Sequence, residues 1–377
     1  MSNASNNSFN NQKGLCIMLK IRNYNLEVPI IQGGMGVGVS LGNLAGAVAA
    51  NGAMGIVSTV NAGFREPDFD KNPVAANLRA LDKEIRSALQ TAAGKGMVGV
   101  NIMVAVNHYE ETVKAAIEAG VNAIISGAGL PVDLPKYAED ADVALAPIVS
   151  SGKAAKTICS YWDKKYNRIP DFIVIEGPKA GGHLGFKKED VLNNTARRTD
   201  EILPEVLEAI KDYEAKYDRK IPVFVGGGVF DGKDMAELMN QGASGVQIGT
   251  RFIATEECDA SQTYKDMMIG ATKEDVVIVQ SPVGMPGRAL RTKLIQDLEK
   301  GIKLLPERCN DCLKACPHGF NAPYCISRAL ISAVTGNTEE GLFFCGENVY
   351  RIKEMTTVKD LIQEIMDECN QELQSNA

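Results

Sequence analysis

The sequence has no excess of basic charge and no long uninterrupted apolar run. Its net charge is −7, which excludes a general attraction to nucleic acid or to anionic membranes. The longest apolar stretch, residues 45–57, is interrupted by Asn51 and three glycines. It cannot span a bilayer, which needs ~20 apolar residues. We therefore expect neither a nucleic acid nor a membrane among the partners.

Signs of secretion are also missing. The N-terminus lacks a basic region followed by an apolar one, so we expect no signal peptide. Nine cysteines in 377 residues are too few for a disulfide scaffold. Together these features favour a reducing, cytoplasmic setting.

Short apolar runs alternate with longer segments of helical periodicity. Runs that are apolar throughout are typical of parallel strands buried on both faces. The eight runs are residues 28–32, 53–58, 97–102, 123–126, 143–147, 172–176, 223–226 and 245–249. The helical segments between them include residues 41–50, 77–92, 109–119, 153–165, 201–216 and 231–240. Eight such units favour a closed (β/α)8 TIM barrel over the alternative, an open doubly wound sheet.

The chain divides into three parts. We expect a disordered tail at 1–20, a barrel at 21–295 that ends in a loop-rich stretch from residue 275 to 291, and a Cys-rich, partly helical extension at 296–377. Apolar residues recur at helical spacing from Val358 to Leu373, and Thr357 and Asp360 form a capping box. This helix is expected to pack on the barrel, the alternative being a contact in a homodimer.

Functional residues of a barrel follow the carboxyl ends of its strands. A long connection, residues 61–77, follows the second strand and is either a lid or a surface insertion. Glycines 226–228 follow the seventh strand, and Gly249 and Thr250 follow the eighth. Barrels bind phosphate at these two places, because backbone N–H groups there grip an anion and glycine permits a close approach. We predict a phosphate-bearing ligand, the alternative being plain tight turns.

His183 is one of only three histidines, and it lies in the glycine-rich loop after the sixth strand, residues 176–186. Histidine titrates near neutral pH, so it suits proton transfer. The alternative is a histidine that only hydrogen-bonds its own loop.

Four segments, residues 29–35, 101–103, 176–183 and 242–252, together resemble the nitronate monooxygenases, formerly called 2-nitropropane dioxygenases. That family is similar to the FMN-dependent enoyl-ACP reductases. The resemblance implies a TIM barrel that binds FMN, with His183 as the catalytic residue. It maps the FMN-binding positions onto Gly33, Gly34, Met35, Asn101, Glu176, Gly182, Gly227, Gly228, Gln247, Gly249 and Thr250.

The resemblance implies a flavoprotein oxidoreductase that oxidises alkyl nitronates with O2 through a flavin semiquinone. His183 would bind the nitro group or take the α-proton from a neutral nitroalkane. In the alternative, FMN passes hydride from NAD(P)H to an enoyl thioester, although Lys179 stands where many enoyl reductases carry Glu. A third interpretation is a non-catalytic flavin-binding module.

Four cysteines cluster in the extension: Cys309, Cys312, Cys316 and Cys325. Thiolates at such spacing can hold an Fe–S cluster or zinc, and His318 could replace one ligand. The alternative is a set of free thiols. An Fe–S cluster would deliver electrons to FMN and would favour the reductase.

Overall fold

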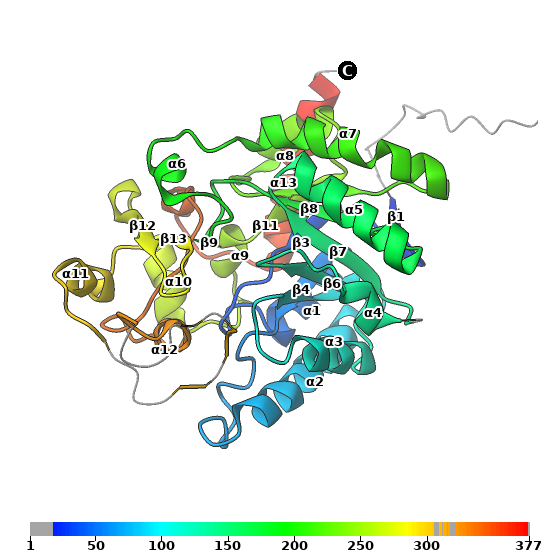
Figure 1. Cartoon of the computed structure of the whole chain (residues 1–377). Coiled ribbons are helices and arrows are strands. Elements are labelled where there is room, and N and C mark those ends of the chain that lie inside the picture. The colour runs from blue at the N-terminus through cyan, green and yellow to red at the C-terminus, as the bar shows by residue number, and fades with distance from the viewer. Residues whose placement is uncertain are drawn as a thin grey trace, which may run out of the picture.

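Eight parallel strands close into a barrel surrounded by helices (Figure 1). The computed structural model describes residues 18–139, 141–304, 309–310, 312–314, 316 and 322–375. Around the barrel the strands are β3 (Ile30–Gln32), β4 (Met54–Ser58), β5 (Met97–Met103), β6 (Ala123–Gly127), β7 (Ala144–Val149), β8 (Ile173–Glu176), β10 (Val223–Gly226) and β11 (Gly245–Ile248). The predicted (β/α)8 barrel is confirmed, and the open doubly wound sheet is excluded.

Helices follow the strands as the periodicity predicted. They are α1 (Gly42–Ala50), α2 (Pro73–Ala92), α3 (Tyr109–Glu118), α4 (Leu134–Ala138), α5 (Gly152–Tyr166), α6 (Lys188–Leu192), α7 (Thr199–Tyr217), α8 (Gly232–Asn240), α9 (Thr250–Ile253) and α10 (Gln262–Ile269), with a 3-10 turn η1 (Lys273–Asp275). Gly120 and Gly242 end α3 and α8 with φ of +89° and +103°, the left-handed conformation that glycine adopts without strain. Within the described residues, no helix has both the length and the apolar composition needed to cross a membrane.

An N-terminal hairpin closes the amino end of the barrel. It consists of β1 (Leu19–Ile21) and β2 (Tyr24–Leu26), and Ile21 and Leu26 are buried in the cluster of side chains that fills the barrel interior. The prediction of a disordered tail at 1–20 is therefore wrong for its last two residues, because Leu19 and Lys20 pair with β2. Residues 1–17 lie outside the described part of the chain.

A second hairpin lies above the carboxyl ends of the strands. Strands β12 (Val276–Gln280) and β13 (Pro286–Leu290) pair with each other, and β13 also pairs with β9 (Gly182–His183). The loop-rich structure expected here is wrong. A run of β-branched residues, 276–279, forms a strand, and Gly284, with a φ of +86°, provides the turn.

The C-terminal extension contains α11 (Lys293–Glu299), α12 (Ile326–Val334), the 3-10 turn η3 (Val349–Arg351) and α13 (Val358–Ser375). Helix α13 packs on α8 so closely that a Cβ at Gly232 would lie 2.3 Å from the Ile365 carbonyl oxygen. The Gly232 N–H donates to Glu368 Oε2 at 2.9 Å. The backbone N–H of Asp360 donates to Thr357 Oγ1 at 3.1 Å, as the capping box predicted.

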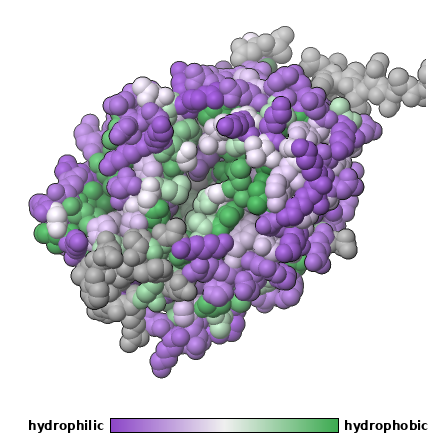
Figure 2. All heavy atoms as spheres, viewed as in Figure 1, coloured by the Kyte–Doolittle hydropathy of each residue, from purple (hydrophilic) through white to green (hydrophobic). Residues whose placement is uncertain are grey.

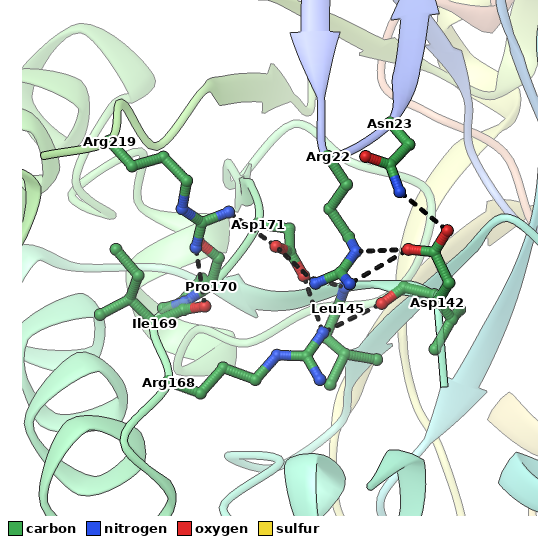
Figure 3. A network of polar contacts seen from close by, with 10 residues as sticks. Arg22, Asn23, Asp142, Leu145, Arg168, Ile169, Pro170, Asp171 and Arg219 are labelled. Atoms are coloured by element: carbon green, nitrogen blue, oxygen red, sulfur yellow. Dashed lines mark hydrogen bonds and ion pairs between the residues drawn. The ribbon is translucent and has the colours of Figure 1, made fainter. Parts of the chain in front are cut away.

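A buried carboxylate, Asp171, joins several segments at the amino end of the barrel (Figure 3). Its side chain is 1% exposed and accepts the Leu145 N–H at 2.9 Å. Arg168 and Arg219 donate to it at 3.0 and 2.7 Å, and Arg22 of the β1–β2 hairpin pairs with it at 3.6 Å. The carboxylate thus balances guanidinium groups from three places in the sequence.

Asp171→Asn should lower the free energy of unfolding by about 3–5 kcal/mol, because it keeps the shape of the side chain but leaves the guanidinium groups without their buried counter-charge. The measurement is urea unfolding followed by circular dichroism. Asp142→Asn is the matched control, since Asp142 also pairs with Arg22 but is 55% exposed, and it should cost no more than about 1 kcal/mol. Equal losses in the two variants would contradict this account.

Candidate active site

A cavity of about 300 Å³ opens at the carboxyl ends of the barrel strands. Figure 2 shows the surface hollowed here, with hydrophobic side chains on the wall of the hollow. Ligand pockets of ~300–1,000 Å³ with mostly apolar walls and a few polar groups are typical of small-molecule sites. This is the end of the barrel at which the sequence placed the functional residues.

The cavity contains every position that the resemblance mapped for FMN, together with His183. These residues lie at the carboxyl ends of strands or in the segments that follow them, and they are Gly33, Gly34, Met35, Asn101, Glu176, Gly182, Gly227, Gly228, Gln247, Gly249 and Thr250. The structure therefore brings the predicted residues together around one space.

Two side-chain amides, those of Asn101 and Gln247, face the cavity beside glycines. A Cβ at Gly34 would lie 2.5 Å from Asn101 Cβ, and one at Gly33 would lie 3.3 Å from Gln247 Cγ. Neither amide hydrogen-bonds another described residue. Their donors and acceptors are therefore available to a ligand with a polar edge, and only glycine leaves room for the backbone next to them.

The two glycine loops lie side by side under the C-terminal extension. Gly227 and Gly228 have φ of +94° and +112°, so their conformation favours glycine. The Gly346 N–H donates to Thr250 Oγ1 at 2.8 Å, which leaves the Thr250 hydroxyl proton free to donate. The Asn348 side chain donates to the Gly228 carbonyl oxygen at 2.8 Å. These loops are thus held in place and can donate to an anion.

Sequence reasoning missed the wall that the extension contributes. Phe344, Cys345, Gly346, Glu347 and Asn348 all line the cavity. No local motif marks them, because the contact between Gly346 and Thr250 joins residues 96 positions apart.

Glu176 ends β8 with a carboxyl group that has no partner among the described residues. The residue is half-buried, and burial raises the pKa of the carboxyl to about 7. At neutral pH a substantial fraction of this group is therefore uncharged, and the uncharged form can donate a hydrogen bond.

His183 lies in β9, and its ring makes two side-chain contacts. Its Nε2 lies 2.8 Å from Ser281 Oγ, and its ring meets the Phe344 ring edge-on with centroids 5.1 Å apart. Burial lowers the pKa of His183 to about 4. The imidazole is therefore neutral at neutral pH, with one nitrogen that donates and one that accepts.

Arg288 fixes the loop that carries His183. This side chain is buried on β13 and donates to the carbonyl oxygens of Pro178 (2.9 Å) and Ala180. Glu347 pairs with Arg288 at 3.5 Å and with Lys179 at 3.6 Å. The histidine loop, the β12–β13 hairpin and the extension are thus tied together by charged groups.

The segment that carries the four clustered cysteines, from Cys309 to Cys325, lies beside the cavity, but none of these cysteines lines it. Leu313 lines the cavity, and the Cys312 carbonyl oxygen accepts the Asn107 N–H at 3.2 Å. In the described ranges, no three His, Cys, Asp or Glu side chains are grouped to hold a metal ion. The predicted Fe–S or zinc site at Cys309, Cys312, Cys316 and Cys325 is therefore not supported, and His318 lies outside the described residues.

The long connection after β4, residues 61–77, does not line the cavity. Asn61 instead donates to Ser327 Oγ in the extension at 2.9 Å, and residues from Pro73 onward belong to α2. Of the two interpretations of this segment, the surface insertion fits the structure and the lid does not.

Glu176→Gln should change how stability depends on pH in the protein stripped of ligand. The folded-state pKa of Glu176, about 7, lies above the ordinary value of 4.5, so its effect on stability is most favourable below pH 4.5 and is lost as pH rises to 7. As the pH rises from 4.5 to 7, the free energy of unfolding of the variant should therefore increase by about 2–3 kcal/mol relative to that of the parent, as urea unfolding would measure. A difference that is the same at pH 4.5 and pH 7.5 would show that the carboxyl is not perturbed.

Comparison with known proteins finds similarity to enzymes of several kinds. The family model described as nitronate monooxygenase matches residues 18–368. A carboxyl-CoA dehydrogenase of Rhodococcus jostii, (3aS,4S,5R,7aS)-5-hydroxy-7a-methyl-1-oxo-octahydro-1H-indene-4-carboxyl-CoA dehydrogenase, is 24% identical over 90% of this chain and 92% of its own length. The protein of the same name from Mycobacterium tuberculosis is 26% identical over 73% of this chain and 66% of its own length.

Other relatives match over shorter stretches or mainly in fold. A probable nitronate monooxygenase of Staphylococcus saprophyticus is 30% identical over 36% of each chain. The structure of FabK from Thermotoga maritima has a TM-score of 0.68 at 25% identity and covers 93% of this chain and 96% of its own. A nitroalkane oxidase from Streptomyces ansochromogenes has a TM-score of 0.68 at 18% identity, with coverage of 93% and 98%, and shows the fold alone. Because the family model spans nearly the whole described chain, the protein is an oxidoreductase of the nitronate monooxygenase family.

Proposed function

We propose that the protein binds FMN in this cavity and oxidises alkyl nitronates with O2. The observation that carries the proposal is the neutral His183 in a cavity that also contains all the mapped flavin positions. A neutral imidazole can donate a hydrogen bond to an anionic oxygen without itself carrying a buried charge.

The residues present fit FMN. The terminal phosphate would be held by the backbone of Gly227, Gly228 and Gly249 and by the Thr250 hydroxyl, which already accepts the Gly346 N–H and keeps its own proton to donate. The unpartnered amides of Asn101 and Gln247 suit the polar edge of a flavin ring. When bound, FMN supplies the electron transfer, for which the amino-acid side chains lining this cavity have no equivalent.

The chain's own residues position the substrate. His183 donates to the nitronate group, and apolar residues such as Met35, Met103 and Phe344 exclude water from the space around it. In this low-dielectric setting a hydrogen bond to a negatively charged oxygen is stronger than it is in water.

A second candidate function is the reduction of an enoyl thioester by NAD(P)H. It is favoured by the match to the Rhodococcus dehydrogenase, which is named as acting on a carboxyl-CoA compound and which aligns with 90% of this chain. Lys179 at the cavity wall argues against a close kinship with the enoyl reductases, since many of them carry Glu there.

Gly34→Ala should abolish or strongly weaken FMN binding. The added Cβ would lie 2.5 Å from Asn101 Cβ, so Asn101 or the backbone has to move into the flavin site. We expect the flavin dissociation constant to rise at least about tenfold, measured by the quenching of flavin fluorescence. Gly185→Ala is the matched control in the histidine loop, since its Cβ would approach other atoms no closer than 3.8 Å. Loss of flavin in both variants, or in neither, would contradict the proposed fit.

Anaerobic reduction of the FMN-loaded protein separates the two candidate functions. We expect ethyl nitronate to bleach the flavin absorbance rapidly and NADH and NADPH to do so slowly or not at all. Rapid bleaching by a nicotinamide but not by the nitronate would replace the monooxygenase with the reductase.

A further inference from the structure

The side chain of Ser281 contacts the catalytic histidine from a distant part of the sequence. Ser281 follows β12, and its Oγ lies 2.8 Å from His183 Nε2 across 98 positions of the chain. Ser281 is 2% exposed, so water cannot readily satisfy its hydroxyl group. A buried hydroxyl needs an acceptor for its proton within the protein.

The contacts of Ser281 determine the direction of this hydrogen bond. The Val283 N–H lies 3.4 Å from Ser281 Oγ, and a backbone N–H can only donate. In the described part of the chain, His183 Nε2 is the other group within hydrogen-bonding distance of Ser281 Oγ, and it can accept when the ring is neutral. The Ser281 proton therefore lies on the line to Nε2.

Tyr324, from the cysteine-bearing segment, does not accept the Ser281 proton in this structure. Its hydroxyl is buried and has no partner within hydrogen-bonding distance among the described residues. It therefore lies too far from Ser281 Oγ to compete with His183 Nε2.

We propose that Ser281 is a positioning residue that fixes His183 as the tautomer with its hydrogen on Nδ1. In this arrangement Ser281 donates to Nε2 and uses the one accepting nitrogen of the neutral ring. Nδ1 has no partner in the residues that the structure describes, and His183 lines the cavity. The Nδ1–H group is thus the hydrogen-bond donor that the ring offers to a ligand.

This tautomer is compatible with only one of the two roles that the sequence left open for His183. Taking the α-proton from a neutral nitroalkane requires a free accepting nitrogen, and Ser281 occupies it. Binding a nitronate oxygen requires a donor, and Nδ1–H supplies it. The enzyme should therefore favour the anionic nitronate over the neutral nitroalkane, a consequence that rests on the proposed function.

The tautomer can be observed directly, because the chain has only three histidines. We would label the histidine side chains of the FMN-loaded protein with 15N and record long-range 1H–15N correlation spectra at pH 7.5. His183→Asn removes one set of signals and so assigns the residue. The expected result is a neutral His183 with a protonated Nδ1 and an unprotonated Nε2. A protonated Nε2, alone or in an imidazolium, would overturn the proposal.

Two variants test whether Ser281 is the cause. Ser281→Ala should give a mixture of the two tautomers and lower kcat/KM for ethyl nitronate about tenfold, while Ser281→Thr, which keeps the hydroxyl, should restore the parental spectrum and activity. Retention of the Nδ1–H tautomer in a folded Ser281→Ala protein would refute the role of Ser281. If the Ala variant does not fold, the spectrum of the parent protein still decides the tautomer.

The spectra also distinguish this inference from the proposed function. They need no turnover, so a protein that fails to oxidise nitronates can still show the predicted tautomer. Conversely, a protein that oxidises nitronates with a protonated Nε2 would keep the proposed function and lose this inference.

Discussion

The candidate site depends on the pairing of β13 with β9, which holds the histidine loop against the rest of the molecule. The loop is rich in glycine, and glycine loses more conformational freedom on ordering than any other residue. Arg288 counters this cost by donating to two carbonyl oxygens of the loop from a buried position. His183 is consequently placed by a strand pair and a guanidinium group, neither of which belongs to the barrel itself.

Burial acts on Glu176 and His183, two titratable groups of the cavity lining, in the same physical sense. It disfavours the charged form of each, so that the pKa of Glu176 rises to about 7 and the pKa of His183 falls to about 4. At neutral pH the imidazole is therefore uncharged, and the carboxyl is uncharged in a substantial fraction of the molecules. The hydrogen bonds that these groups donate strengthen as water is excluded.

Much of the barrel could be predicted because its strands are short, apolar and buried on both faces, a pattern present in neighbouring residues. The positions that the resemblance mapped line one cavity for a related reason, since they lie at or just beyond the carboxyl ends of strands and the closed barrel brings those ends to one rim. The hairpin from Val276 to Leu290 was misjudged. Its proline- and glycine-rich turn obscured a β-branched run that pairs with β13, and β13 in turn pairs with β9, a partner far away in the sequence.

By itself the sequence determined the closed barrel, the glycine loops at its rim and the presence of a single histidine among them, because periodicity and turn chemistry are local properties. Only the tertiary structure decided that residues 344–348 form part of the cavity, that Ser281 meets His183, and that the four clustered cysteines lie outside the cavity lining. These contacts join residues roughly a hundred positions apart, as Gly346 and Thr250 are at a separation of 96. Their formation depends on how whole elements pack, and no short stretch of sequence encodes it.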